Sequence, residues 1–299
     1  MANRKQLIRL LAITEKLRNS KEASFDEISD YLKRKSEITG DDLNITLRTF
    51  QRDIKDIYSI FDVEIKCNSY HKYYIQYDGS DEMQPRMFEA FDILHALKIT
   101  NDLSLYIHPE KHGGGTENIY GFIHAIKKQI VIKITHKKFW DAEPNKRNVE
   151  PYGLKEFRGR WYLIAKDKNS NTIKTFGLDR IHDIELTKEK FSLPEDFNVK
   201  TLFKSCFGIV MPEKNEKPEK IILSFSPLKG NFIKSLPLHE SQQVIIDNEK
   251  ECRVQLFIYI THDFVRELLA HSEELEVISP KSLKNKLNQI YKSALNTEK

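Results

Sequence analysis

The most informative stretch of this 299-residue chain reads Gly159-Arg160-Trp161-Tyr162-Leu163-Ile164-Ala165. A turn at Arg158-Gly159 and the alternation that follows predict a strand over residues 161–166. Side chains of a strand alternate between its two faces, so Trp161, Leu163 and Ala165 lie on one face and Arg160 and Tyr162 on the other. We expect the first face to fill a hydrophobic core rather than to contact a ligand. The second face, with Arg160 and Tyr162, is compatible with core packing and with ligand contact.

Similar short strands surround this one. They are expected over Ile130–His136, Val149–Phe157, Ile173–Leu178 and Ile181–Leu186, with a turn at 168–171 and a short helix over Gly121–Lys128 before them. Five short strands with tight turns suggest a small closed or half-closed barrel, because closure removes the exposed edges of a sheet.

Positive charge is concentrated in this part of the chain. Residues 118–190 contain 16 Lys and Arg against 9 Asp and Glu, a net charge of +7, whereas the whole chain carries +4. Such an excess can attract an anionic partner, although a solvated basic surface is the alternative explanation.

The motif at 159–165, together with Phe176-Gly177-Leu178-Asp179-Arg180-Ile181 and the pair Arg147 and Pro151, resembles the WYL domain. Two positions depart from that family, which commonly has Tyr at the place of His136 and Arg at the place of Gly177. The resemblance implies an SH3/Sm-like β-barrel over 118–190. It also implies a transcription regulator whose barrel senses a ligand, which in some members is single-stranded DNA, another nucleic acid or a nucleotide.

The candidate ligand-binding residues combine guanidinium groups suited to phosphate with rings on which a base can stack. They are His136, Arg147, Tyr152, Arg158, Arg160, Tyr162 and Arg180. The alternative for Arg180 is a surface ion pair with Asp179 or Asp183.

Residues 1–78 predict a winged helix-turn-helix domain. Helices are expected over 4–18, from a capping box at Ser24–Glu27 to about Ser36, and from Leu47 to Phe61, with a polar connection over 37–45. Strand-like alternation over 63–77, around a turn at Asn68-Ser69, predicts the wing.

The third of these helices is the candidate recognition helix. A buried stripe is expected at Leu47, Phe50, Ile54, Ile57 and Phe61, with polar residues, including Asp53 and Asp56, on the opposite side. Residues 46–54 also resemble the recognition-helix signature of a large bacterial regulator group. Any amphipathic helix has a polar face, which is the alternative. The candidate DNA contacts are Thr46 (also the expected N-cap), Arg48, Thr49, Gln51, Arg52, Lys55 and, on phosphate, Lys72.

The remaining segments are a linker and bridging helix over 79–117, a linker over 191–218 and an α+β module over 219–299. The helix expected over 87–99 has two explanations, pairing with its copy in a dimer or simple core packing. Residues 238–242 and 275–280 resemble the WCX extension of WYL regulators, with Ser272 where Gly is usual. That resemblance implies a role in dimerisation or in gating the pocket.

Several function classes lack support in the sequence. No apolar run approaches the roughly 18 residues of a membrane span and no signal peptide is recognisable, so we expect a cytoplasmic protein. Cys67, Cys206 and Cys252 are expected to be reduced thiols. No catalytic, cofactor-binding or metal-binding motif is complete.

The sequence therefore predicts an α+β multidomain, ligand-responsive DNA-binding transcription regulator that is not an enzyme and acts as a homodimer on a double-stranded operator. The main rival is a module for single-stranded nucleic acid in which the basic barrel is the working part. A nucleotide-processing enzyme is a third hypothesis.

Overall fold

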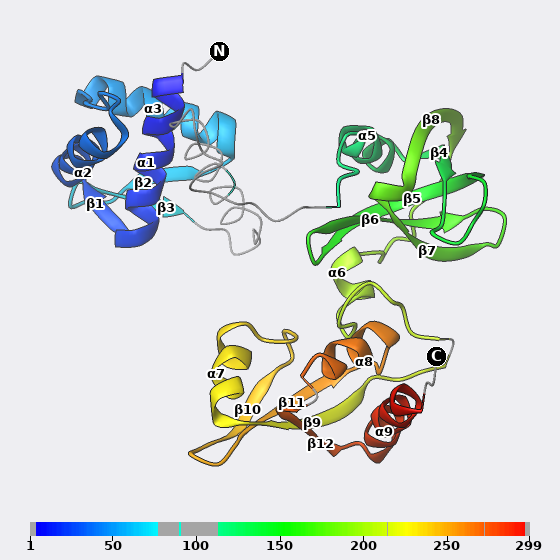
Figure 1. Cartoon of the computed structure of the whole chain (residues 1–299). Coiled ribbons are helices and arrows are strands. Elements are labelled where there is room, and N and C mark those ends of the chain that lie inside the picture. The colour runs from blue at the N-terminus through cyan, green and yellow to red at the C-terminus, as the bar shows by residue number, and fades with distance from the viewer. Residues whose placement is uncertain (1–3, 77–89, 91–112, 214, 272, 297–299) are drawn as a thin grey trace. The chain divides into compact units, whose positions relative to one another are not determined.

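The computed structural model describes residues 4–76, 90, 113–213, 215–271 and 273–296, and it is α+β with three antiparallel sheets in the described part of the chain (Figure 1). The chain divides into two compact units, Met1–Glu110 and Lys111–Lys299. The helix expected over 87–99 lies outside the described residues. Among the described helices, none has the length and apolar character that crossing a membrane requires.

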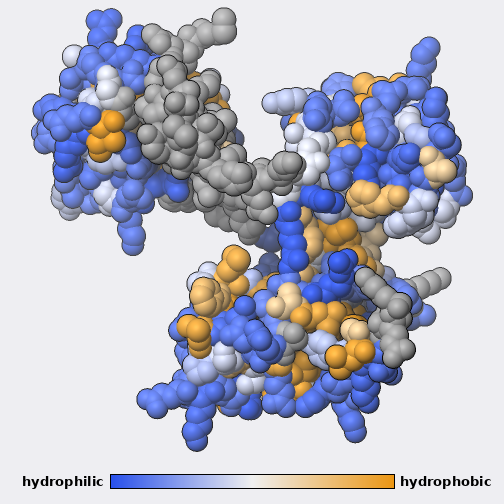
Figure 2. Space-filling view, viewed as in Figure 1, coloured by the Kyte–Doolittle hydropathy of each residue, from blue (hydrophilic) through white to orange (hydrophobic). Residues whose placement is uncertain are grey.

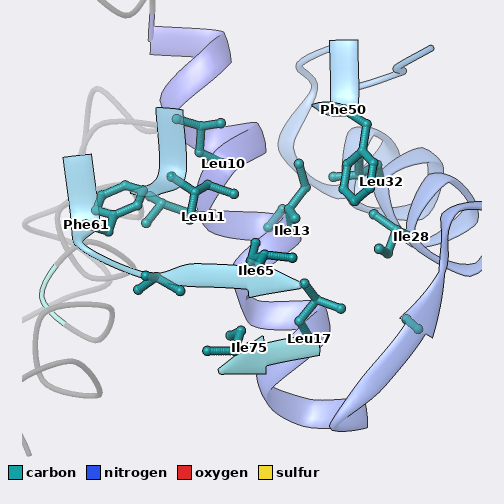
Figure 3. Close-up of a cluster of buried hydrophobic side chains, with 14 of the residues drawn as sticks. Leu10, Leu11, Ile13, Leu17, Ile28, Leu32, Phe50, Phe61, Ile65 and Ile75 are labelled. Atoms are coloured by element: carbon teal, nitrogen blue, oxygen red, sulfur yellow. The ribbon is translucent and has the colours of Figure 1, made fainter. Parts of the chain in front are cut away.

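Residues 4–76 of the N-terminal unit form three helices and a small sheet. Its elements are α1 (Arg4–Ser20), β1 (Glu22–Ser24), α2 (Phe25–Thr39), α3 (Leu47–Phe61), β2 (Glu64–Cys67) and β3 (Lys72–Gln76), with sheet order β1-β3-β2. Apolar side chains from the three helices, such as Leu10, Ile28 and Phe50, form one buried cluster with Ile65 and Ile75 of the sheet (Figure 3). One shared core therefore holds α3 against the rest of the unit.

The caps expected in this unit are confirmed. Ser24 and Glu27 form a complete capping box on α2, and the Thr46 side chain accepts a hydrogen bond from the backbone N–H of Thr49. The expected end of α2 near Ser36 is wrong, because the helix continues to Thr39 and ends where Gly40 adopts the left-handed conformation, with φ of 70°. Strand β1 was not predicted, since three residues are too few to show alternation.

The C-terminal unit begins with the basic segment. It contains α5 (Ile119–Lys128), β4 (Ile130–His136), β5 (Asn145–Phe157), β6 (Arg160–Asp167), β7 (Thr172–Gly177), the 3₁₀ turn η2 (Leu178–Arg180) and β8 (Ile181–Lys190), in sheet order β7-β6-β5-β4-β8. Leu163 and Ala165 are fully buried and Trp161 packs against the same cluster, which confirms the predicted core face.

The opposite face of this sheet is covered as well. Ile164 and Ile173 pack with Phe203 and Cys206, which belong to the segment that contains α6 (Val199–Leu202). The sequence predicts a linker over 191–218, but part of that segment is a second layer on the sheet. The strand pattern could not show this, because the covering residues are irregular in spacing.

The last module contains β9 (Glu219–Phe225), α7 (Pro227–Ser235), β10 (Gln243–Asp247), β11 (Cys252–Ile258), α8 (His262–Leu269), β12 (Leu275–Ser279) and α9 (Lys281–Leu295). The sheet order is β10-β11-β9-β12, so the element order and strand order are those of the split β-α-β arrangement. All three helices contribute to one core with the sheet.

Some details of this module differ from expectation. Helix α7 and strand β10 were not predicted, and α9 begins after Pro280, which is its N-cap. Hydrophobic areas are visible on the surface of this module (Figure 2), and Leu228, Phe232 and Leu236 around α7 are more than half exposed.

Candidate nucleic-acid interface and effector pocket

Helix α3 is fixed to α1 by a buried ion pair. The Arg9 guanidinium donates to both carboxylate oxygens of Asp53, with Nε 2.6 Å from Oδ2 and Nη2 2.8 Å from Oδ1. Asp53 is fully buried, and its hydrogen bond raises the pKa of Arg9. The prediction that Asp53 lies on the polar outer face is therefore wrong. Helical spacing alone cannot separate an exposed carboxylate from one that faces a buried arginine on another helix.

The outer face of α3 carries the predicted cations. Arg48, Gln51, Arg52 and Lys55 are all exposed, and none of them has a side-chain partner among the described residues. The inner stripe is correct for Phe50, Ile57 and Phe61, while Leu47, expected in that stripe, is 47% exposed. The helix thus presents free donors along one side and is held by packing on the other.

Other predicted DNA contacts are already engaged within the protein. The Thr46 and Thr49 hydroxyls lie 3.0 Å apart at the start of α3, where they form its cap. Lys72, in the β2–β3 hairpin, donates to Glu22 of β1 across 3.1 Å, and this bond raises the pKa of the lysine. To bind phosphate, the Lys72 ammonium must break its hydrogen bond to Glu22 or contact Glu22 and the phosphate at the same time.

A pocket of about 410 Å³ opens in the C-terminal unit beside the five-stranded sheet. It is lined by His136, Lys138, Trp140, Arg147, Ile173, Lys174, Thr175, Phe176, Arg180, Ile209, Val210 and Met211. The structure therefore brings together three of the seven predicted ligand residues, His136, Arg147 and Arg180. They come from the end of β4, from β5 and from η2.

The other four predicted ligand residues lie elsewhere. Tyr152 is buried against Phe191 and Phe197, and burial together with its bond to Glu150 raises its pKa to about 12. Tyr162 is buried too. Arg158 pairs with Glu267 of α8, and Arg160 lies 3.6 Å from Asp179. None of these four lines the pocket, so the face of β6 on which Arg160 and Tyr162 were predicted is not part of it.

A buried carboxylate organises two of the pocket cations. Asp167 is fully buried and accepts from Arg147 Nη1 at 2.8 Å and from Lys174 Nζ at 2.7 Å. Burial disfavours its charge, but the bonds from Lys174 and from the backbone of Asn169 outweigh burial and lower its pKa. One carboxylate thus binds two cations, so these three groups together leave a net positive charge at the pocket.

His136 is a neutral group in this cationic setting. It is 5% exposed, and its ring meets Phe176 edge-on at 5.3 Å between centroids. Burial, followed by the charges of Arg180, Arg147 and Lys138, lowers the pKa of His136 to about 4 against the smaller opposing effect of Asp141. At neutral pH the ring therefore donates from one nitrogen and accepts at the other.

Two pocket features were not predicted. Phe139 and Trp140 follow β4 and are 71% and 77% exposed, and the guanidinium of Arg180 lies 4.8 Å from the Phe139 ring centroid. The sequence signal was present, because a Lys-Lys-Phe-Trp run over 137–140 combines charge with aromatic rings.

The second unpredicted feature is the wall formed by residues 209–211. Asp263 of α8 accepts from the backbone N–H groups of Ile209, at 2.9 Å, and Val210, at 3.2 Å. No sequence pattern links these positions, which lie more than fifty residues apart. No group of three or more His, Cys, Asp or Glu side chains suited to a metal occurs within the described ranges.

A known protein family matches the segment that forms most of the five-stranded sheet. Residues 118–186 match the family described as WYL domain, so this part of the chain is a WYL domain. A stretch of this chain is 36% identical over 69 residues to Protein PafB of Mycobacterium tuberculosis and of Mycobacterium bovis. That match covers 22% of this chain and 20% of those relatives, so it spans about a fifth of their length.

Two solved structures share weak overall similarity. The first is the proteasome accessory factor B/C (PafBC) of Arthrobacter aurescens, at 19% identity and a TM-score of 0.34, covering 95% of this chain and 46% of that one. The second is a CRISPR Cas-related protein, at 9% identity and a TM-score of 0.42, covering 98% of this chain and 91% of that one.

Proposed function

We propose that this chain is a DNA-binding transcription regulator, not an enzyme, whose N-terminal unit is a winged helix-turn-helix domain. The observation that supports this most is the outer face of α3, where Arg48, Gln51, Arg52 and Lys55 are exposed and without partners among the described residues. Arginine and glutamine side chains read base edges in the major groove, and lysine contacts phosphate. The buried pair of Arg9 and Asp53 orients this face.

We further propose that the WYL domain, as an SH3/Sm-like barrel, senses an anionic effector such as a nucleotide or a short single strand. Lys138, Arg147, Lys174 and Arg180 line one pocket. Asp167 offsets only part of their charge, and a low-dielectric wall strengthens the attraction for an anion.

A homodimer completes this proposal, with its site of action in the cytoplasm. Two linked recognition helices read half-sites about one helical turn apart, which multiplies affinity and specificity. Duplex sites selected by the protein should then contain two copies of one motif at a fixed spacing. A single unrepeated motif would contradict the dimer without affecting the role of α3.

The experiment selects bound duplex fragments from genomic DNA of the source at near-physiological salt, with and without short single-stranded DNA as effector. The test variant is Arg48→Ala/Arg52→Ala. The matched control is Lys33→Ala/Arg34→Ala, which removes the same charge from exposed positions of α2. Enrichment of a motif by the native protein and the control, but not by the test variant, supports the proposal. Equal enrichment by all three proteins contradicts it.

A second candidate function is binding of single-stranded nucleic acid without duplex recognition. The exposed Phe139 and Trp140 rings beside the cationic pocket favour it, because base stacking on such rings is sequence-tolerant. Retention of single strands together with failure to enrich any duplex motif, with or without added effector, would make this the better function.

A further inference from the structure

Two buried polar atoms of the pocket have no partner among the described residues. They are Nε2 of His136 and Nε of Arg180. Buried polar atoms are nearly always hydrogen-bonded, because an unsatisfied one has lost its water without gaining another partner. Both residues line the same pocket, so a bound group can satisfy both atoms.

The backbone holds these two residues next to each other. His136 ends β4 and pairs in register with Ile181, the residue after Arg180. The next residue, Lys137, donates its backbone N–H to the carbonyl oxygen of Arg180 across 3.1 Å. The Phe139 ring then covers the Arg180 guanidinium. The two side chains thus come from the end of β4 and from η2, which precedes the neighbouring strand β8, and both line the pocket.

Gly177 provides the space that the Arg180 side chain occupies. A Cβ atom at this position would lie 2.7 Å from Nη2 and 2.9 Å from Nε of Arg180, and 2.5 Å from Oδ1 of Asp179. The backbone φ of Gly177 is −62°, which any residue can adopt. Glycine is therefore required here for the room it leaves to the guanidinium, and not for its conformation.

The charges around the two atoms favour an anion. Arg147 and Lys174 line the same pocket and share Asp167, and Lys138 lies over the Trp140 ring. On the acidic side, Asp179 lies 3.8 Å from Arg180 Nε, too far for a hydrogen bond, and Asp141 faces His136 more weakly than the cations do. The neutral His136 ring can donate without adding charge.

We propose that one phosphate group of the effector binds between His136 Nε2 and Arg180 Nε, and that Gly177 positions the Arg180 guanidinium for it. This rests on the proposed effector sensing and adds the group that is recognised.

Gly177→Ala separates positioning from folding. The atoms that its Cβ would meet are the ends of flexible side chains, which can move at little cost. We therefore expect an unchanged melting temperature but a displaced guanidinium. The conservative pair at the other position is His136→Gln, which keeps a neutral donor, and His136→Leu, which removes it.

The experiment follows the ring nitrogens of His136 by NMR in the full chain while inorganic phosphate, AMP or adenosine is added. Phosphate and AMP should shift the His136 signals saturably, and adenosine should not. Arg180→Met and Gly177→Ala should weaken AMP binding about tenfold or more, the loss expected for one charge-assisted hydrogen bond. Lys133→Met, which removes a cation from the outer side of β4, should bind AMP like the native protein.

Absence of a saturable His136 shift with both phosphate and AMP would overturn the subsite, as would native affinity in Arg180→Met. Native affinity in Gly177→Ala would overturn the role of the glycine. These outcomes are independent of the duplex selection. Operator binding without a His136 response contradicts only the subsite, and a His136 response without duplex enrichment contradicts only the DNA-binding proposal.

Discussion

At the scale of single residues, the buried pair of Arg9 and Asp53 shows how one contact orients a functional surface. A buried carboxylate is tolerated only with a partner, and here both of its oxygens are satisfied by one guanidinium. Because Arg9 lies on α1 and Asp53 on α3, the pair sets which side of α3 faces outward.

Asp53→Ala should destabilise the N-terminal unit by about 3 to 5 kcal/mol, because it leaves the Arg9 charge buried and unpaired. Hydrogen exchange of the α3 backbone amides measures the loss. Asp56→Ala, which removes an acceptor of the partly buried Gln6 amide, is the control and should cost about 1 kcal/mol. Similar losses of stability in both variants would mean that the buried ion pair stabilises the unit no more than the hydrogen bond between Gln6 and Asp56 does.

His136 should make the WYL domain less stable in acid. Its pKa is about 4 in the folded state and 6.5 in the unfolded chain, so only the unfolded chain takes up a proton between these values. Stability from this residue is complete above pH 6.5, falls as the pH drops toward 4, and is then constant. The total loss should be about 3 kcal/mol.

Tryptophan fluorescence reports this transition selectively, because the chain has 2 Trp residues and both, Trp140 and Trp161, belong to the WYL domain. Urea unfolding at several pH values should show a weaker acid dependence in His136→Gln than in the native protein. Parallel pH curves for the two proteins would contradict a lowered pKa of His136.

At the scale of elements, the helices and strands that were predicted correctly are the longer ones with a regular apolar pattern. The strand over Ile130–His136 and the helix over Leu47–Phe61 were predicted with their observed bounds, because each has a repeating apolar pattern and a clear boundary signal. Strand β1 and strand β10 were missed. The first has three residues and the second lies at a sheet edge with mostly exposed side chains, so neither shows alternating burial.

Thr46→Ala should destabilise α3 by about 1 kcal/mol, because the Thr49 backbone N–H loses its acceptor at the N-terminus of the helix. Thr46→Ser keeps that acceptor and should lose much less. Exchange of the amides in the first turn of α3 measures both changes. Equal losses in the two variants would show that the methyl group, and not the cap, is responsible.

Arg52→Ala should weaken specific duplex binding by about 1 to 3 kcal/mol if the side chain makes a bidentate base contact. Fluorescence anisotropy with a selected duplex and a scrambled duplex separates specific from general binding. The same loss on both duplexes would instead assign Arg52 to phosphate. Unchanged affinity with an intact fold would exclude it from the interface.

At the scale of the whole molecule, the pocket proposed to bind an effector is built by segments far apart in the chain. Its floor comes from the WYL strands, whereas residues 209–211 form a wall that Asp263 of the last module holds by two backbone hydrogen bonds. The last module is therefore a structural part of the pocket within the C-terminal unit.

Asp263→Ala should release this wall and speed hydrogen exchange of the Ile209 and Val210 amides, with a loss of about 1 to 3 kcal/mol. Asp247→Ala is the control, since Asp247 pairs with Lys234 at a largely exposed site and should leave those amides unchanged. Unaltered exchange at residues 209 and 210 in Asp263→Ala would show that other contacts hold the wall.

The sequence by itself determined the three N-terminal helices, the five strands of the WYL domain, the core face of Trp161, Leu163 and Ala165, and the cationic outer face of α3. These follow from local periodicity, which the chain carries in the spacing of its own residues. Only the tertiary structure decided that Asp53 is buried, that Tyr152 and Tyr162 lie away from the pocket, that Lys174 and Trp140 line it, and that Asp263 holds the wall at residues 209–211. Such facts depend on contacts between distant segments, and local spacing contains no information about which segments meet.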